Sequence, residues 1–327
     1  MDGKRFFIFI VYLRALAACL ITNSHYEGIY PFPEIANGGL LGDILFFAVS
    51  GYCLWTPERD VSFGTWYAKR LQRCLLPVWV ITVLFGFGGI LEVTQENFRY
   101  LFLYPTNYHF VSSIMILCIP FFLCMKFFSR ALPQISAGLW GVYLLIYILF
   151  YDKSVYHIDT VREPMILFLF LQSMFLGAYF RENVDHYIHS FSRLQIPLLF
   201  FLAVLYGGSK YSFTRYGSLS SLQFLNQFLI FALLFVLFRI FVGLEQKLPR
   251  RPAMLRPVNI LATVTLEIYL VQFPIIDFFQ HHTTFPVNWL LCSICILTAA
   301  FLLHYFCIFI TKSCSLLLKQ LHERLGY

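Results

Sequence analysis

A charged and a titratable side chain stand eleven residues apart near the start of the chain, where most neighbours are apolar. Arg14 lies within the apolar run that begins at Phe6, and His25 closes the segment YLRALAACLITNSH. Eleven residues of α-helix turn through about 1,100° and rise about 16 Å, so both side chains return to nearly the same face. A guanidinium stays charged and is costly inside a bilayer, which indicates a function for Arg14. Alternatively, Arg14 reaches the cytoplasmic membrane edge while His25 caps the helix or faces water.

The second apolar run carries a carboxylate near its outer end. This is Asp43, and Ser50 follows seven residues deeper on the same helical face. Neighbouring helices place Asp43 at the depth of His25 and Ser50 closer to Arg14, and a carboxylate beside an imidazole orients a general base. We therefore expect His25 and Asp43 to be catalytic and Ser50 to contact substrate. Alternatively, Asp43 caps its helix, and Ser50 with Gly51 permits close helix contact.

A basic cluster on the cytoplasmic side is suited to phosphate. Lys69, Arg70 and Arg73 precede Pro77 in the segment WYAKRLQRCLLP. Arg70 and Arg73 are three residues apart, so on a helix both guanidinium groups face one side and match a phosphate or pyrophosphate. The general excess of basic residues at cytoplasmic membrane edges also accounts for such a cluster.

The elements that position these residues are membrane helices. Hydrophobic residues make up 59% of the 327 and charged residues only 13%, which excludes an ordinary soluble domain. We expect an all-α integral membrane protein with about ten transmembrane helices, forming one domain over residues 1–327 without a soluble domain. The predicted spans lie near residues 6–23, 40–56, 75–91, 110–128, 135–151, 164–180, 194–208, 222–242, 258–279 and 287–311.

The distribution of basic residues predicts the orientation. With the N-terminus inside, 18 of the 24 lysines and arginines face the cytoplasm and Arg14 lies in the membrane. The five on the outer side are Arg99, Lys153, Arg162, Lys210 and Arg215. This bias places both termini in the cytoplasm. It also accounts for the net charge of +7 without a nucleic-acid partner.

Two further polar residues are candidates for substrate binding. Glu267 lies inside the ninth run, where a carboxylate is a functional candidate, although pairing with Arg14 or a polar group of another helix explains it equally well. His109 lies at the outer start of the fourth run and could line a substrate entrance, or belong to an interfacial aromatic belt. His304 is expected to be a helix-packing residue.

No metal site or disulfide framework is expected. The nine cysteines lie in or beside apolar runs, and the pair Cys292 and Cys295 lacks histidine or acidic company, which favours helix packing. His281 and His282 stand in an external loop without a nearby carboxylate or cysteine to complete a site.

Four segments together resemble the membrane-bound acyltransferase family 3. They are LRALAACLITNSH, GDILFFAVSGY, KRLQR with Pro77, and TLEIYLVQFPII, Thr265 to Ile276. The resemblance implies that acyl-CoA, usually acetyl-CoA, enters from the cytoplasm and that the acceptor is acylated on the far side. It implies Arg14 and His25 as essential, Arg70 and Arg73 as contacts to CoA phosphates, and Asp43 as the matching acidic position.

The chain departs from the family pattern at two places. No acidic residue precedes Arg14 in FIVYLR, and Gln272 stands where many members carry a histidine. We expect His25 to deprotonate an acceptor hydroxyl that attacks the thioester, by direct transfer or through an acyl-histidine.

These features predict O-acetylation of a cell-surface or exported glycan, or of a lipid-linked sugar, by an enzyme surrounded by lipid in a bacterial inner membrane. The main alternative is a transporter or flippase of lipid-linked sugars that grips pyrophosphate without chemistry. A non-catalytic partner of a polysaccharide synthase is a second alternative, and it leaves Arg14 and His25 without a role.

Overall fold

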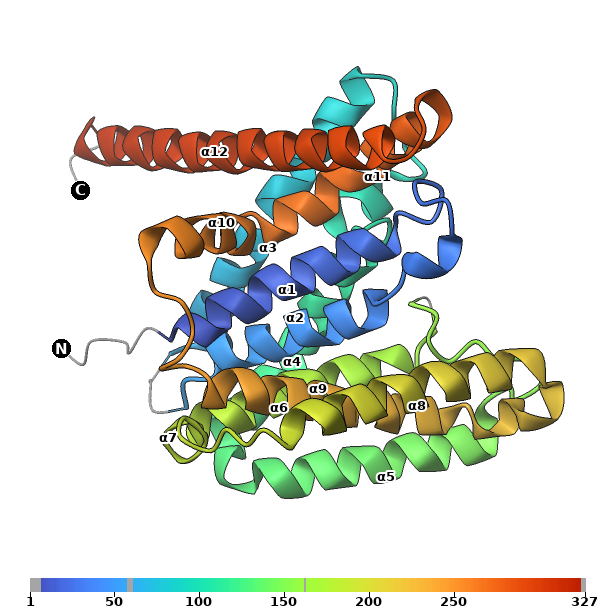
Figure 1. The fold of residues 1–327 in the computed structure, drawn as a ribbon. Helices are drawn as coiled ribbons and strands as arrows, with labels where there is room; N and C mark the ends of the chain where they lie inside the picture. Colours follow the sequence, from blue (N-terminus) through green and yellow to red (C-terminus); the bar gives the residue numbers. More distant parts are fainter. Residues whose placement is uncertain (1–6, 58–60, 162, 325–327) are drawn as a thin grey trace. The chain divides into compact units, whose positions relative to one another are not determined.

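The computed structural model describes residues 7–57, 61–161 and 163–324, and helices account for nearly all regular structure in these ranges (Figure 1). Arg162, predicted to face outward, lies outside them. Within the described part of the chain there is no strand. The helices are α1 (Ile8–Ser24), α2 (Gly39–Leu54), α3 (Phe63–Phe87), α4 (His109–Phe127), α5 (Leu132–Phe150), α6 (Ile166–Glu182), α7 (Val184–Tyr187), α8 (Gln195–Arg215), α9 (Phe224–Gly243), α10 (Pro252–Thr263), α11 (Thr265–His282) and α12 (Val287–Arg324).

The all-helical membrane fold predicted from the apolar runs is confirmed, and each run overlaps a helix. Among the described residues, seven helices are long and apolar enough to cross a membrane, or eight if α10 and α11 form one broken span. The remaining predicted spans fall on α1 and α6, which have 17 residues each. Both are short for a bilayer crossing, so a count of about ten stays a prediction.

Several predicted boundaries are wrong, and two of them bear on the site. Helix α3 begins at Phe63 rather than near residue 75, because lysine, arginine and leucine continue the helix through the basic cluster. The ninth run is interrupted at Val264, between α10 and α11. Three β-branched residues in succession, Thr263 to Thr265, disfavour a continuous helix there.

The chain divides into two compact units. The first unit comprises Met1–Ile21, Gly38–Phe63 and Ser113–Ala262, and the second comprises Thr22–Asn37, Gly64–Ser112 and Thr263–Tyr327. The prediction of one domain over residues 1–327 stays a prediction.

The first unit is built around the crossing of α2 and α6. A Cβ on Gly51 would overlap the backbone of Met174, and a Cβ on Gly177 would overlap the backbone of Ala48. The two glycines therefore let the helix backbones touch, as small residues do between membrane helices. The alternative reading of Gly51, close helix contact, is confirmed.

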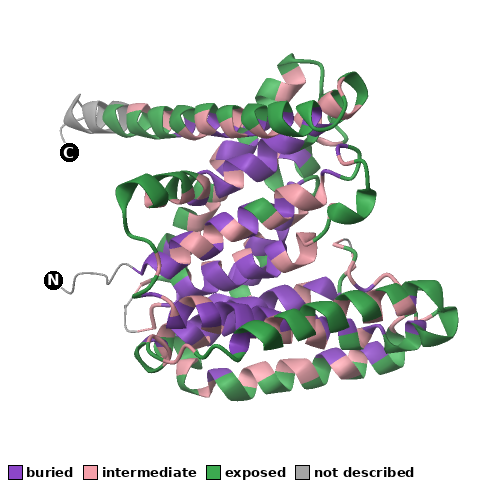
Figure 2. Ribbon diagram, in the orientation of Figure 1, coloured by how far each residue is buried: buried purple, intermediate pink, exposed green. Residues whose placement is uncertain are grey.

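Buried residues concentrate on α2, α6 and α9 within the first unit (Figure 2). Helix α8, in contrast, presents large apolar side chains outward, among them Phe200, Phe201 and Val204. Apolar exposure of this extent along one helix is unfavourable in water and is expected where lipid surrounds the protein.

The second unit packs α11 along α12. The buried side chains of α12 recur every three or four residues, as one stripe of a helix requires: Cys292, Ile296, Ala300, Leu303 and Cys307. Cys295 points out of this stripe and is exposed. The helix-packing role predicted for Cys292 is therefore confirmed.

Candidate functional site

The residues predicted to form the site are distributed over both units. Arg14, Asp43 and Ser50 belong to the first unit. The second unit contains His25, Arg70, Arg73, His109 and Glu267. The predicted pairing of His25 with Asp43, and the shared stripe of Arg14 and His25, stay predictions.

Within the second unit, one surface of α11 contacts two of the predicted histidines. Tyr269 and Phe273 are four residues apart and therefore neighbours on the helix. The Tyr269 hydroxyl lies 3.2 Å from Nδ1 of His109. The Phe273 ring meets the His25 ring edge-on, with 4.6 Å between centroids. Helix α11 thus places both imidazoles on adjoining parts of its surface.

His25 lies in the turn directly after α1, which ends at Ser24. Its backbone N–H donates to the Thr22 carbonyl at 3.1 Å, so the chain leaves the helix in a tight turn. Burial lowers the pKa of the His25 imidazole, because an apolar environment disfavours the charged form. A neutral imidazole is the state that accepts a proton, so His25 is suited to act as a general base.

The segment around His25 is held by polar contacts that the sequence analysis missed. Asn23 donates through Nδ2 to the carbonyls of Ile35, at 2.9 Å, and Asn37, at 3.0 Å. The Tyr26 hydroxyl is 3.0 Å from Oγ of Ser293 on α12. These contacts on both sides of His25 fix the loop that carries it, as a preorganised catalytic group requires.

His109 is the first residue of α4, and an aromatic ring of α11 contacts it. Besides its hydrogen bond, its ring meets the Tyr269 ring at 89°, with centroids 5.8 Å apart. Tyr108 precedes it in the loop and is buried, which raises the pKa of the Tyr108 hydroxyl to about 12. His109 is therefore tied to α11, consistent with a role inside the unit.

Glu267 forms a close pair with a histidine of α12. Its Oε1 lies 2.7 Å from Nδ1 of His304, and the Glu267 side chain is only 9% exposed. Pairing with a polar group of another helix, one of the alternatives for Glu267, is confirmed. His304 was expected only to pack, and its role as partner could not be read from sequence because the two residues meet through tertiary packing.

The basic cluster lies on the first turns of α3, not in a loop. The Arg70 guanidinium stacks over the Trp66 indole at 4.6 Å, and its Nη1 donates to the Trp66 carbonyl at 3.1 Å. Arg70 is half-buried, whereas Lys69 and Arg73 are exposed. The stacked Arg70 is fixed in direction, and the exposed Arg73 is accessible, so the two can bind an anion together.

The Cys74 thiol lies within the electrostatic influence of both this basic cluster and Glu267. The charges of Arg73, Arg70 and Glu267 all act on Cys74. Arg70 and Arg73 on α3 and Glu267 on α11 are thus near enough to Cys74 to act on it electrostatically. The second unit therefore combines an arginine pair, a carboxylate–imidazole pair and two further histidines.

In the first unit, Arg14 lies on α1 beside a face that packs on α10. Val11 and Ala15 are buried against Ala262, and Arg14 itself is half-buried. Its side chain is therefore neither fully in the core nor fully outside, which is compatible with lining a passage.

Asp43 is buried, 6% exposed, in the second turn of α2. The residue that caps this helix is Gly38, and no side chain makes a cap hydrogen bond there. The alternative that Asp43 caps the helix is therefore wrong. Ser50, two turns further on, is half-buried beside the helix crossing at Gly51.

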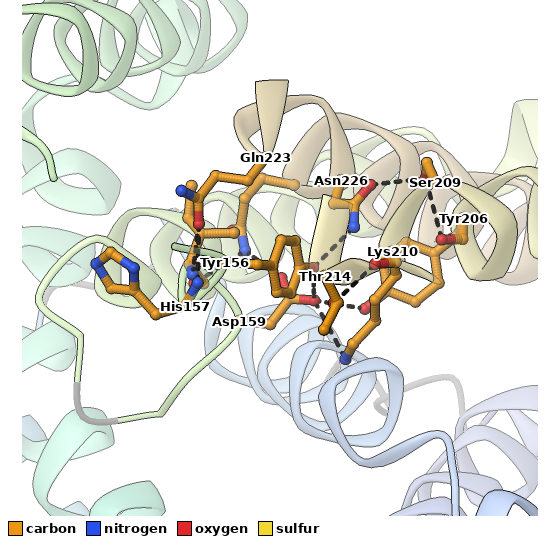
Figure 3. Close-up of polar contacts among 11 residues, drawn as sticks. Tyr156, His157, Asp159, Tyr206, Ser209, Lys210, Thr214, Gln223 and Asn226 are labelled. Carbon is orange, nitrogen blue, oxygen red and sulfur yellow. Dashed lines mark hydrogen bonds and ion pairs between the residues drawn. The ribbon is translucent and has the colours of Figure 1, made fainter. Parts of the chain in front are cut away.

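The first unit also contains a polar network that the sequence analysis did not identify. Figure 3 shows Asp159, in the loop before α6, accepting hydrogen bonds from the hydroxyls of Tyr156, at 2.5 Å, and Tyr206, at 2.9 Å. Lys210 lies 3.4 Å from the same oxygen, and Gln227 donates to the other at 2.9 Å. These bonds tie the loop to α8 and α9.

The backbone of this loop is held by side chains of α9 and the turn before it. Gln223 accepts from the N–H groups of His157, at 2.9 Å, and Ile158, at 3.0 Å. Asn226 donates to the Tyr156 hydroxyl at 2.7 Å and accepts from Ser209 at the same distance (Figure 3). The polar atoms are mostly satisfied internally, so the network serves to position the loop.

The family match agrees with the resemblance that the four segments show. A family model described as an acyltransferase domain, Acyl_transf_3, matches residues 7–311 of the chain. No curated protein and no solved structure matches the chain. The matched range includes every residue predicted for the site, and the resemblance inferred from the segments is confirmed.

Proposed function

Because the chain belongs to acyltransferase family 3, we propose that this multi-pass membrane protein transfers an acyl group, specifically acetyl, from cytosolic acyl-CoA to a hydroxyl of a cell-surface or exported glycan. The acceptor is a glycan or its lipid-linked precursor. The membrane is a bacterial inner membrane, crossed about ten times, with both termini in the cytoplasm.

The observation that carries this proposal is the environment of His25. Its imidazole contacts the Phe273 ring, with 4.6 Å between the ring centroids, and burial lowers the pKa of the imidazole. An imidazole that remains neutral at cellular pH can take the proton of a sugar hydroxyl as the oxygen attacks the thioester carbonyl. Asp43 is proposed to orient this ring.

The donor enters from the cytoplasmic side along the basic residues. Arg70 and Arg73 bind its phosphates, where the stack of Arg70 on Trp66 presets the direction of one guanidinium group. Arg14 lines the passage of the acyl-bearing arm through the membrane. No metal takes part in this scheme.

The transfer step needs no reactant besides acyl-CoA and the acceptor hydroxyl. The acceptor oxygen loses its proton to His25 and forms a new bond to the acyl carbon. The carbon–sulfur bond breaks, and CoA leaves as a thiolate that recovers the proton from the imidazolium. An acyl-histidine route would divide the same bond changes into two steps. Ser50, His109 and Glu267 are assigned to substrate contacts, with His109 at the acceptor entrance.

Mass spectrometry of surface glycans from cells with and without the gene tests the proposal. We expect the cells that carry the gene to show glycans heavier by one acetyl group per modified residue. Identical glycans in both cells would refute acetyl transfer to this acceptor class. Complete loss of the glycan without the gene would instead indicate transport or synthesis.

A further inference from the structure

Gln272 is an unexplained polar side chain in the interior of the second unit. It lies on α11, is 0% exposed, and neither its Oε1 nor its Nε2 has a hydrogen-bond partner among the described residues. A buried amide without partners is strongly unfavourable, and nearly all such groups in folded proteins are satisfied by protein, water or ligand. The amide therefore calls for a partner that the described part of the chain does not supply.

The position of Gln272 connects it with His25. Gln272 and Tyr269 are three residues apart on α11, and the adjacent Phe273 contacts the His25 ring. The hydroxyl of Thr22, three residues before His25, is also buried and lacks a hydrogen-bond partner within the described structure. Orphaned polar atoms therefore occur on both of the segments that meet at the contact of His25 with Phe273. Polar groups inside a membrane bundle commonly mark a ligand pathway.

The donors and the acceptor of a primary amide limit which chemical groups can be its partner. Gln272 offers two N–H donors and one carbonyl acceptor, which together match a secondary amide that accepts and donates in return. The pantetheine arm of CoA carries two secondary amides, and the nearer one is separated from the thioester sulfur by two methylene groups. A side chain that held this amide would position the thioester close to the catalytic base.

The backbone hydrogen bonding of α11 is interrupted on either side of Gln272. Pro274, two residues later, cannot donate the hydrogen bond that would lock the carbonyl of Leu270, and the helix is interrupted at Val264. The short stretch of α11 between these two points is thus less constrained than a continuous helix.

We propose that Gln272 binds the pantetheine amide nearest the thioester and thereby selects donors that carry it. This inference rests on the proposed acyl-CoA-dependent function. Many family members carry a histidine at this position. Here the glutamine would recognise the donor arm, and His25 would carry out proton transfer.

A pair of small thioesters tests the inference with the purified full-length protein in lipid nanodiscs. One donor is S-acetyl-N-acetylcysteamine, which contains the amide, and the other is an acetyl thioester of the same length with methylene groups in its place. The acceptor is the glycan identified by mass spectrometry. We expect the unaltered protein to prefer the amide donor about tenfold in kcat/KM, and Gln272→Leu to lose this preference.

Gln280→Leu is the matched control, because Gln280 lies on the same helix and donates to Asp277 at 2.9 Å. It should keep the full preference. Gln272→Asn retains an amide but shortens the side chain, so it should reduce the preference partly; it serves as the test if the leucine variant does not fold. An unchanged preference in both Gln272 variants would refute the inference alone. Absence of transfer from acetyl-CoA by the unaltered protein would refute the proposed function as well.

Discussion

His304 and Glu267 lie 2.7 Å apart, Nδ1 to Oε1, across the packed helices α12 and α11. The carboxylate is almost completely removed from solvent, and the imidazole is 22% exposed. In such surroundings either group without the other would be costly, because its polar atoms would lose their partner. The pair therefore specifies how α11 and α12 align in the second unit.

Loss of both partners of this pair should destabilise the protein less than the two single losses added together. We expect Glu267→Leu and His304→Leu each to lower the thermal unfolding midpoint, and the double variant to lose less than the sum of the two. The coupling should be about 0.5–3 kcal/mol, the range for two residues that share a hydrogen bond. A double-mutant cycle on detergent-solubilised protein measures it, and strictly additive losses would argue against the pair.

His25→Ala should abolish acyl transfer while the protein remains inserted in the membrane at normal abundance. The physical reason is that no other group would accept the proton of the attacking hydroxyl at that point. Acylation of the glycan is measured by mass spectrometry, and protein abundance by immunoblot of the membrane fraction. Normal acylation by this variant would overturn the assignment of His25.

The acid limb of the pH–rate profile should lie below the usual histidine range. Burial lowers the pKa of His25, so the ring stays neutral, and competent as a base, when pH falls through about 6.5. The value of kcat/KM should therefore stay level through this region and decline only at lower pH. An acid limb centred at or above 6.5 would contradict the burial effect.

Substitution of Arg70 or Arg73 by alanine should weaken donor binding with little effect on the chemical step. Each lost phosphate contact should raise KM for acetyl-CoA about 10- to 100-fold, the range of charge-assisted hydrogen bonds. Arg70→Lys should also be impaired, because lysine cannot reproduce the planar stack on Trp66. The exposed Arg130, which lies outside this cluster, provides the control variant Arg130→Ala. An unchanged KM in both alanine variants of the cluster would exclude a phosphate site.

Alanine at the crossing of α2 and α6 should destabilise the first unit. A methyl group on Gly51 or Gly177 would overlap the backbone of the opposite helix, so the helices would have to separate. Gly141→Ala on α5 is the control, because its added Cβ meets nothing within 4 Å and alanine favours helix by about 1 kcal/mol. Thermal unfolding should show a loss at the first two positions and none at Gly141.

The sequence by itself determined the class of protein and the location of its helices. Apolar runs long enough for a bilayer can form only helices there, because backbone polar groups have no water to bind in lipid. Local spacing was also sufficient to predict that Arg70 and Arg73 point to the same side, since residues three apart share a face of any helix. The order of four short segments was enough to recognise the family that the match over residues 7–311 established.

Only the tertiary structure decided which polar groups meet. The contact of Tyr269 with His109 joins positions 160 residues apart, and the partner of Glu267 lies 37 residues away on another helix. Hydrophobic periodicity specifies which face of a helix is buried, but it carries no information on the helix that covers it or on the register between them. The orphaned amide of Gln272 likewise became visible only once every neighbouring donor and acceptor had a position.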